Sequence, residues 1–388
     1  MSYYADRLEE LRGRGLLRRL RRLDSPAGAV VRLEGRELVC FCSNDYLSLA
    51  NDRRLSEAAA RAAHRWGWGA AASRLITGTM GPHLRLEEEI ARFKRAEAAL
   101  VFTSGYLANL AAVRAGAARG DTIFSDALNH ASLIDACRLS GAAIRVFAHR
   151  DYDHLDRLLG QTPTTGRRLI VTDSLFSMDG DFADLPRLVE IKRRYGADLC
   201  VDEAHATGVC GREGRGVGEM MGVEEAVDIT VGTLSKALGG LGGFVCGSRE
   251  LIDYLINTAR SLIYTTGMPP SVCEAAVEAI GIVRDEPWRR ARVGELAERL
   301  RRGLIRAGLN IGDSASHIVP VLVGEAEAAM ELAGALLARG LLVWPIRPPS
   351  VPEGTARLRI SVTAGHTADQ IDALIDALRE SAGRDPSR

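Results

Sequence analysis

The chain has 388 residues, and 46% of them are hydrophobic, which excludes an intrinsically disordered protein. Fifty Lys and Arg residues balance fifty Asp and Glu residues, so the formal net charge is zero and no global field attracts nucleic acid or an anionic membrane. We therefore expect a globular protein of two or three lobes, with no nucleic-acid and no membrane partner.

Targeting and cysteine patterns point to a cytoplasmic protein. No apolar run approaches the roughly 18 residues of a membrane span, and Asp6, Glu9 and Glu10 precede any block that could form a signal peptide. The seven cysteines are odd in number and include no C-x-x-C pair, which argues against a disulfide framework and against a zinc site. We expect buried thiols and no metal.

The elements expected in the first two thirds of the chain indicate an α/β protein. Residues 1–24 predict an amphipathic basic helix, or two, interrupted at Gly13 and Gly15. From about residue 37 to 270, short apolar runs alternate with helical patterns. The expected strands are residues 38–41, 99–102, 121–124, 144–147, 169–172, 199–202, 229–232 and 243–246. Strands regularly followed by helices predict a mostly parallel sheet that is covered on both faces.

The last third of the chain predicts a smaller α+β lobe. Its expected elements are helices at 272–308, 326–339 and 367–381 and strands at 318–323, 341–344 and 358–362. The predicted domains are therefore an N-terminal helical segment (1–40), a large domain (41–272) and a small C-terminal domain (273–388). Ligands of open α/β folds bind outside the carboxyl ends of the strands, so the chemistry should follow those strands.

Lysine is rare in this sequence, because only three of the fifty basic residues are lysines. Lys94 and Lys192 lie in charged helical patterns, and we expect both on solvent-facing sides of helices. Lys236 instead lies among small residues, in Thr-Leu-Ser-Lys-Ala-Leu-Gly-Gly (233–240), just after a predicted strand. A primary amine in that position is a candidate catalytic group.

Polar clusters follow five of the predicted strands. They are Ser-Gly-Tyr (104–106), Asn-His (129–130), residues 174–177, Asp-Glu-Ala-His (202–205) and Thr-Leu-Ser-Lys (233–236). One amine, one carboxylate, two imidazoles and several hydroxyls suit a cofactor with a carbonyl, a ring and a phosphate. Pyridoxal 5′-phosphate (PLP) meets all three requirements, since a helix start binds phosphate and an aspartate pairs with the protonated ring nitrogen.

Three other interpretations of these motifs are weaker. Asp-Glu-Ala-His after an apolar strand is typical of nucleotide-driven helicases, but the chain has no Gly-Lys dipeptide and so no phosphate-binding loop of that type. A serine acyl-transfer motif S-x-x-K needs serine where Thr233 stands. The glycine-rich stretches 208–218 and 239–243 do not show the order strand, G-x-G-x-x-G and helix that dinucleotide sites require.

The motifs together resemble the α-oxoamine synthases, a family of fold-type I PLP-dependent transferases. Besides the clusters above, the resemblance rests on Ser-Asn-Asp-Tyr-Leu (43–47), Ser-Arg-Leu-Ile-Thr-Gly (73–78), Phe-Ser-Met-Asp-Gly-Asp (176–181) and Ile-Tyr-Thr-Thr-Gly-Met-Pro-Pro (263–270). It implies a large domain with a mostly parallel seven-stranded sheet flanked by helices, and a smaller α+β C-terminal domain. It also implies PLP as cofactor and a homodimer with shared active sites.

The stretch 346–360 resembles one branch of this family. Arg347 and two prolines stand where other branches usually show a Tyr-Pro pair. The resemblance implies condensation of L-alanine with a pimeloyl thioester and loss of CO2 in biotin biosynthesis, with coenzyme A or acyl carrier protein as the acyl carrier. Ser350 replaces a more usual threonine, and Asp173 stands where some members have glutamate.

The resemblance assigns the cofactor contacts residue by residue. Lys236 is the Schiff-base lysine and proton shuttle, and Asp202 is the partner of the pyridine nitrogen. His130 stacks on the ring, while His205 and Ser177 contact its phenolic oxygen.

The phosphate contacts implied by the resemblance come from two chains. They are the backbone amides of Gly105 and Tyr106, the Thr233 hydroxyl, and Thr266 of a second subunit.

Substrate contacts follow from the same resemblance. Arg359 binds the amino-acid carboxylate, for which a bidentate guanidinium is well suited. Arg18, Asn44 and Ser350 contact substrate, and Arg347 lies near the acyl chain.

Three other functions stay open at this stage. A related α-oxoamine synthase could use glycine or serine, or another acyl thioester, with the same machinery. A non-catalytic PLP-fold protein would be expected to have lost Lys236, Asp202 or Arg359, and all three are present. Nucleic-acid binding by the arginines of residues 12–22 lacks interleaved aromatic residues.

Overall fold

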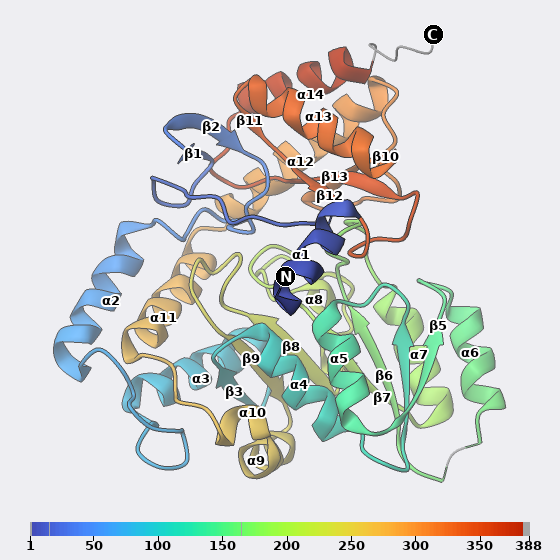
Figure 1. Cartoon of the computed structure of the whole chain (residues 1–388). Coiled ribbons are helices and arrows are strands. Elements are labelled where there is room, and N and C mark those ends of the chain that lie inside the picture. The colour runs from blue at the N-terminus through green and yellow to red at the C-terminus, as the bar shows by residue number, and fades with distance from the viewer. Residues whose placement is uncertain (1, 15, 164, 383–388) are drawn as a thin grey trace.

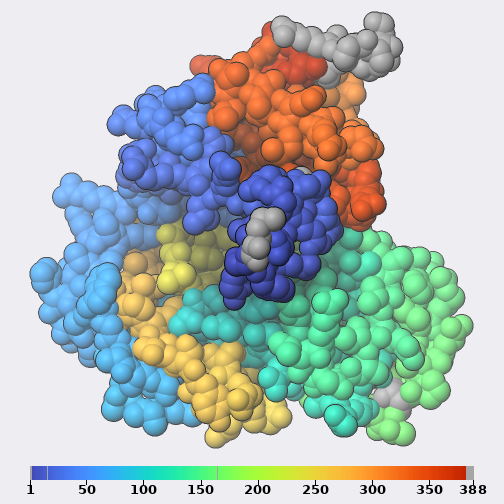
Figure 2. Space-filling model, viewed as in Figure 1, coloured from blue at the N-terminus to red at the C-terminus, as the bar shows by residue number. Residues whose placement is uncertain are grey.

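The computed structural model describes residues 2–14, 16–163 and 165–382. Figure 1 shows a large lobe built around a central sheet and a smaller lobe that carries the last helices of the chain. The N-terminal helix α1 (Tyr3–Gly13) lies on the surface where the two lobes meet (Figure 2).

A seven-stranded sheet forms the centre of the large lobe, with the order β3-β9-β8-β7-β6-β4-β5. Its strands are β3 (Ala98–Phe102), β4 (Thr122–Asp126), β5 (Ala143–Phe147), β6 (Arg168–Asp173), β7 (Asp198–Asp202), β8 (Ile229–Thr233) and β9 (Gly243–Gly247). β9 runs antiparallel to both of its neighbours, whereas the other pairs of neighbouring strands are parallel. This confirms the expected mostly parallel seven-stranded sheet.

Helices cover both faces of this sheet, as the sequence predicts. Along β6, Leu169 and Val171 face one hydrophobic core and Ile170 faces the other, because successive side chains of a strand point to opposite faces. One core contains α4 (Gly105–Gly116), α5 (Ala131–Ser140), α9 (Arg249–Thr258) and α10 (Arg260–Ile263). The other contains α2 (Arg53–Trp66), α3 (Gly81–Lys94), α6 (Tyr152–Gln161), α7 (Leu185–Tyr195), α8 (Val217–Met220) and α11 (Pro270–Asp285), and the short 3-10 helix η1 (Glu224–Ala226) follows α8.

The small lobe combines two three-stranded sheets with three helices. One sheet has the order β10-β13-β12, with β10 (Ile318–Gly324), β12 (Trp344–Ile346) and β13 (Ala356–Ser361). The other has the order β1-β2-β11, with β1 (Val30–Leu33), β2 (Arg36–Cys40) and β11 (Leu341–Leu342). The helices are α12 (Trp288–Arg306), α13 (Ala326–Ala338) and α14 (Ala368–Ala382).

The N-terminal segment differs from its expected helical structure. Among the described residues of this segment, α1 is the only helix, and residues 30–40 form the hairpin of β1 and β2. β2 also pairs with β11, and Phe41 joins the core of the small lobe. The strand expected at 38–41 therefore belongs to the small lobe, because its apolar side chains find their partners in the C-terminal part of the chain.

The expected domain boundaries at 40/41 and 272/273 stay predictions. α11 packs on α2 and α3 and contributes Cys273 and Ile280 to a core of the large lobe. The single helix expected over 272–308 is two helices, because the chain breaks at Pro287, where a proline lacks the amide a continuous helix needs. The change from one lobe to the other falls at this break.

The two structural lysines are less exposed than the sequence predicts. Lys94 donates hydrogen bonds to the Thr207 hydroxyl and to the backbone carbonyl of Arg215. Lys192 pairs with Asp228 and donates to the Ala226 carbonyl at 2.8 Å. Both therefore tie a helix to neighbouring loops instead of facing solvent. Among the described helices, none is both long and apolar enough to span a membrane.

Candidate active site

The candidate site lies where neighbouring strands of the large sheet end together. β6, β7 and β8 end at Asp173, Asp202 and Thr233. A cavity of about 220 Å³ lies nearby, and it is lined by Cys42, Asn44, His130, Ser177, Met178, His205, Lys236, Trp344, Ile346 and Arg359. Six of the residues predicted from the sequence line this one cavity: Asn44, His130, Ser177, His205, Lys236 and Arg359.

Lys236 supplies the amine of this cavity. Its Nζ atom lies 2.9 Å from Nε2 of His205. Burial lowers the pKa of Lys236 to about 8, although the carboxylates of Asp202 and Asp173 act in the opposite direction. Burial also lowers the pKa of His205 well below its ordinary value, so this imidazole is neutral. A neutral amine attacks carbonyls and accepts protons, and this environment favours it.

Asp202 is held in place by two hydrogen bonds at the end of β7. Its Oδ2 accepts from Nδ2 of Asn109, on α4, at 2.6 Å, and its Oδ1 accepts from the amide of Ala204 at 2.7 Å. Nδ2 of Asn109 also donates to the Ser132 hydroxyl. A buried, oriented carboxylate of this kind is suited to stabilising a protonated ring nitrogen.

His130 caps the N-terminus of α5 and is oriented by two contacts. Its Nδ1 lies 2.7 Å from the Ser132 hydroxyl, and its backbone amide donates to Oδ2 of Asp173 at 2.7 Å. Burial raises the pKa of Asp173 well above its ordinary value, and the neighbouring carboxylate of Asp202 adds to this effect. Burial lowers the pKa of His130, so the ring is neutral and its face is available to an aromatic ligand.

The start of α4 can receive a phosphate. Ser104 caps this helix by accepting a hydrogen bond from the amide of Leu107, whereas within the described residues the amides of Gly105 and Tyr106 have no protein acceptor. A β-carbon on Gly105 would lie only 3.5 Å from Cβ and Oγ1 of Thr233, so the predicted phosphate ligands are adjacent. Free amides at a helix N-terminus form an anion site.

Tyr46 is a site residue to which the sequence analysis gave no role. Its fully buried hydroxyl lies 2.7 Å from Nδ1 of His205 and 3.1 Å from Oδ1 of Asn44. It also accepts a hydrogen bond from Nη2 of Arg359 at 3.2 Å. The hydroxyl therefore connects the imidazole beside Lys236 with the predicted carboxylate-binding arginine. Its position inside the motif at 43–47 was the available sequence signal.

Arg359 lies on β13 of the small lobe and reaches the large lobe. Its Nε donates to the backbone carbonyl of Ser177, and its Nη1 donates to Asn44 Oδ1 and to the Ser361 hydroxyl. With the contact to Tyr46, four of its five N–H groups are used within the described protein. This fixes the guanidinium and leaves one N–H of Nη2 for a ligand.

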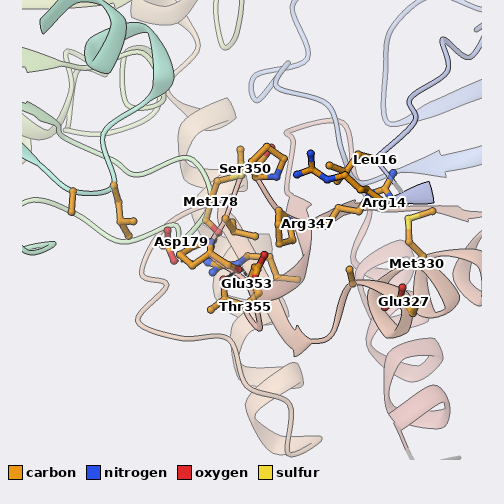
Figure 3. Close-up of a pocket in the computed structure, with 18 of the residues that line it drawn as sticks. Arg14, Leu16, Met178, Asp179, Glu327, Met330, Arg347, Ser350, Glu353 and Thr355 are labelled. Carbon is orange, nitrogen blue, oxygen red and sulfur yellow. Dashed lines mark hydrogen bonds and ion pairs between the residues drawn. The ribbon is translucent and has the colours of Figure 1, made fainter. Parts of the chain in front are cut away.

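A second and larger cavity, of about 1210 Å³, adjoins the first at Met178, which lines both. Figure 3 shows Arg347 between Met178 on one side and Arg14 and Leu16 on the other. Ser350 also lines this cavity. The predicted acyl-chain and substrate residues Arg347 and Ser350 thus lie together, in a space larger than the amine site.

Two predicted contacts, those of Arg18 and Thr266, are not brought to Lys236 within this chain. Arg18 is exposed and does not line either cavity. The Tyr106 side chain turns outward and donates to Asp135, at 2.7 Å, so only its backbone amide faces the phosphate position. Thr266 is exposed and forms an isolated bridge with Ser73. The roles of Arg18 and Thr266 stay predictions.

These groups fit PLP. Lys236 offers an amine of lowered pKa, and Asp202 offers a buried carboxylate with fixed orientation. His130 offers a neutral ring, and the start of α4 offers free amides beside Thr233. Each part of the cofactor therefore has a matching group at the same end of the sheet.

The family comparisons agree with this chemistry. A family model for class I and II aminotransferases matches residues 36–378. The 8-amino-7-oxononanoate synthase of Geobacter sulfurreducens is 48% identical over 377 residues, which cover 96% of both chains. That of Stutzerimonas stutzeri is 47% identical and covers 97% of this chain and 96% of its own. The chain belongs to the 8-amino-7-oxononanoate synthase family.

Solved structures give the same fold for other members of this group. A serine palmitoyltransferase from S. paucimobilis with bound PLP–myriocin aldimine is 31% identical with a TM-score of 0.93, covering 98% of this chain and 96% of its own. An 8-amino-7-oxononanoate synthase from Francisella tularensis is 29% identical with a TM-score of 0.78. The match covers 89% of this chain and 98% of that structure's chain. The expected fold-type I PLP-dependent transferase and the expected cofactor are confirmed.

Proposed function

We propose that this enzyme condenses L-alanine with a pimeloyl thioester to give 8-amino-7-oxononanoate, CO2 and the carrier thiol, a step of biotin biosynthesis. The observation that supports it most strongly is the shared cavity of Lys236 and Arg359, in a chain 48% identical to a synthase of this name. The amine and the carboxylate ligand needed for an α-amino acid thus lie in one space.

Lys236 and Asp202 have different roles in the proton transfers of this reaction. When bound, PLP withdraws electrons from the α-carbon of the amino acid, which makes loss of its proton and later of CO2 possible. Lys236, whose pKa burial lowers to about 8, accepts the α-proton as the neutral amine. Asp202 keeps a proton on the ring nitrogen, and its bonds to Asn109 and Ala204 hold it ready for that task.

The amino-acid carboxylate is bound by Arg359. A guanidinium fixed by Ser177, Ser361 and Tyr46 needs little reorganisation, and its remaining Nη2 proton can reach a ligand. The 3.2 Å contact to Asn44 is long enough to yield to a carboxylate, after which the Asn44 amide can turn to the same ligand.

The thioester occupies the larger cavity in this proposal. That cavity joins the amine site at Met178. Its wall is mixed in charge, since Arg14, Arg347 and Arg357 line it together with Asp179, Glu327, Glu331 and Glu353. In this proposal the Arg347 guanidinium contacts the far carboxylate of the pimeloyl chain, while Arg357 pairs with Asp179.

We also propose that the active form is a homodimer. Thr266 and Arg18 are exposed and do not line the Lys236 cavity in one chain, which is expected if Thr266 serves the phosphate site of a partner.

Thiol release tests the function directly. In one series the PLP-loaded protein is given pimeloyl-CoA with L-alanine, glycine or L-serine. In a second series it is given L-alanine with acetyl-, succinyl- or palmitoyl-CoA. The Lys236→Ala variant is the blank. We expect release with L-alanine and pimeloyl-CoA. A parallel arm with pimeloyl-acyl carrier protein compares the two carriers. Release confined to any other pair would contradict the assignment.

A second candidate is condensation of L-serine with palmitoyl-CoA. Serine palmitoyltransferase structures match this fold with TM-scores of up to 0.93, above the 0.78 of the synthase from Francisella tularensis. The sequence identities favour the first function, at 48% against 31%. In the same assay, L-serine combined with palmitoyl-CoA decides between the two functions.

A further inference from the structure

Two cysteines lie side by side at the wall of the Lys236 cavity. Cys40 is the last residue of β2, and its Sγ lies 3.7 Å from Sγ of Cys42. Cys40 is buried, whereas Cys42 is half-buried and lines the cavity with Lys236. The other five cysteines are buried at separate positions and line neither cavity.

The backbone around the pair makes the two thiols converge. Phe41 points the opposite way, into the core of the small lobe, where its ring stacks on His366. Alternation along an extended chain therefore places Cys40 and Cys42 on one side. Hydrogen bonds to the small lobe fix the backbone of this segment. The Cys40 carbonyl accepts from His366 Nε2, the Phe41 amide donates to the Leu342 carbonyl, and the Phe41 carbonyl accepts from the Ser361 amide.

The surroundings favour a thiolate within the pair. The hydrogen bond from Cys42 lowers the pKa of Cys40 to about 7, against the effect of its burial. The same hydrogen bond and burial raise the pKa of Cys42, and the positive charges of Arg359 and Arg21 only partly oppose this, so the pair holds one thiolate and one thiol. A thiolate shared across a hydrogen bond, with one sulfur reachable from a cavity, is the arrangement of a reactive thiol with a resolving partner.

We propose that Cys40 and Cys42 form a thiol–disulfide exchange site that opens into the active-site cavity and reacts with small-molecule disulfides such as glutathione disulfide. Cys42 first passes its proton to the Cys40 sulfur across their contact, and the resulting Cys42 thiolate attacks one sulfur of glutathione disulfide. This breaks that S–S bond and releases one glutathione thiolate that takes up a proton. Cys40 then loses its proton and attacks Cys42 Sγ in the mixed disulfide, releasing the second glutathione. Two protein thiols are oxidised, and one disulfide is reduced to two thiols.

The closing step requires only a small movement. The sulfur atoms must approach by about 1.7 Å to reach a bonding distance of about 2.05 Å. The half-buried Cys42 can provide it by turning its side chain away from the cavity, while Cys40 stays in the sheet.

Peptide mass spectrometry tests the proposal on the PLP-loaded enzyme. Trypsin cleavage after Arg36 and Arg53 gives residues 37–53, which contain both thiols and no other cysteine. The enzyme is reduced, freed of reductant, treated with glutathione disulfide, quenched in acid, and then unfolded and alkylated. We expect this peptide to lose two hydrogen atoms and escape alkylation, while the other five cysteines are alkylated.

Single variants establish the order of the steps. In Cys40→Ser, the peptide should retain one glutathione on Cys42, because no resolving thiol remains. In Cys42→Ser, Cys40 should stay free, because it is covered by the sheet. Cys137→Ser, in a different core, is the matched control and should behave like the wild type. If Cys40→Ser does not fold, a rapid-quench series on the wild type should show the mixed disulfide at Cys42 before the internal one.

Two results would overturn the proposal. One is full alkylation of both thiols in the wild-type peptide at glutathione disulfide concentrations that oxidise a free peptide of the same sequence. The other is a glutathione adduct on Cys40 in Cys42→Ser, which would show that the cavity does not direct the attack.

Discussion

Opposing contributions to the pKa of Lys236 decide its reactivity. Burial favours the neutral amine, while the carboxylates of Asp202 and Asp173 favour the ammonium form. Burial prevails, so the amine gives up its proton near pH 8 instead of near its ordinary value of 10.5. The same group can therefore act as a nucleophile and as a base without a separate activating residue.

We expect the reaction of Lys236 with formaldehyde and a borohydride, in PLP-free protein, to follow a titration with a midpoint near pH 8. The neutral amine is the nucleophile, so the rate rises with pH and levels off above the midpoint. Peptide mass spectrometry measures the rate at this lysine alone. Asp202→Asn should move the midpoint to lower pH, because it removes a charge that favours the ammonium form. A midpoint above pH 10 would contradict this account.

Tyr46→Phe removes one buried hydroxyl that touches three site residues. We expect kcat/KM for the amino acid to fall at least tenfold, about 1.4 kcal/mol, because His205 and Arg359 lose a common partner. The matched control is Tyr152→Phe, which also removes one hydroxyl, bonded to the Asp184 amide away from the site. Steady-state kinetics on both variants check this, and equal losses would show a general effect of lost hydrogen bonds.

The sequence identified the chemistry of individual residues better than their contacts. Lys236, Asp202 and Arg359 are chemically distinctive in their motifs, so residue type was enough to single them out. Tyr46 is not distinctive, and its importance comes from contacts with His205 and Arg359, which are distant in sequence. Cys42 is not distinctive either, and only the fold places it in the cavity wall with Lys236. Local patterns contain no information about such contacts.

At the scale of elements, short apolar runs between helical patterns predicted the seven central strands, because six of them are buried on both faces and only the edge strand β5 is largely exposed. The same pattern assigned β2 to the large sheet, whereas β2 pairs with β11 in the small lobe. An apolar strand has the same sequence pattern in either sheet. At Pro287, by contrast, a single residue determines the structure, because this proline divides the long helical pattern into α11 and α12.

The close approach of β9 to the start of α4 gives an element-scale prediction. A β-carbon on Gly243 would lie 2.6 Å from Cα and 2.7 Å from N of Gly105, so the backbone would have to move. We expect Gly243→Ala to raise the Kd for PLP at least tenfold, because the free amides of α4 shift. Gly281→Ala, where nothing lies within 4 Å, should leave this Kd unchanged. Fluorescence titration of PLP-free protein measures both, and equal values would refute the phosphate assignment.

At the scale of the molecule, α1 contributes little to the fold in one chain. None of its residues is buried, although Arg14, directly after it, lines the larger cavity. We expect deletion of residues 2–14 to leave the Tm within about 2 °C of the full chain, since few contacts are lost. The KM for the thioester should rise several-fold while that for L-alanine stays the same. Calorimetry and thiol release measure these effects, and a large fall in Tm would contradict the first.

The short segment from Phe41 to Tyr46 joins the two lobes through the site. Phe41 is anchored in the core of the small lobe and Tyr46 in that of the large lobe, and Asn44 lies between them. Arg359 is carried by the small lobe, yet it is bonded to Ser177 of the large lobe. The amino-acid site therefore spans the junction of the two lobes, and any rotation of one lobe against the other would have to bend this segment and break the contact of Arg359 with Ser177.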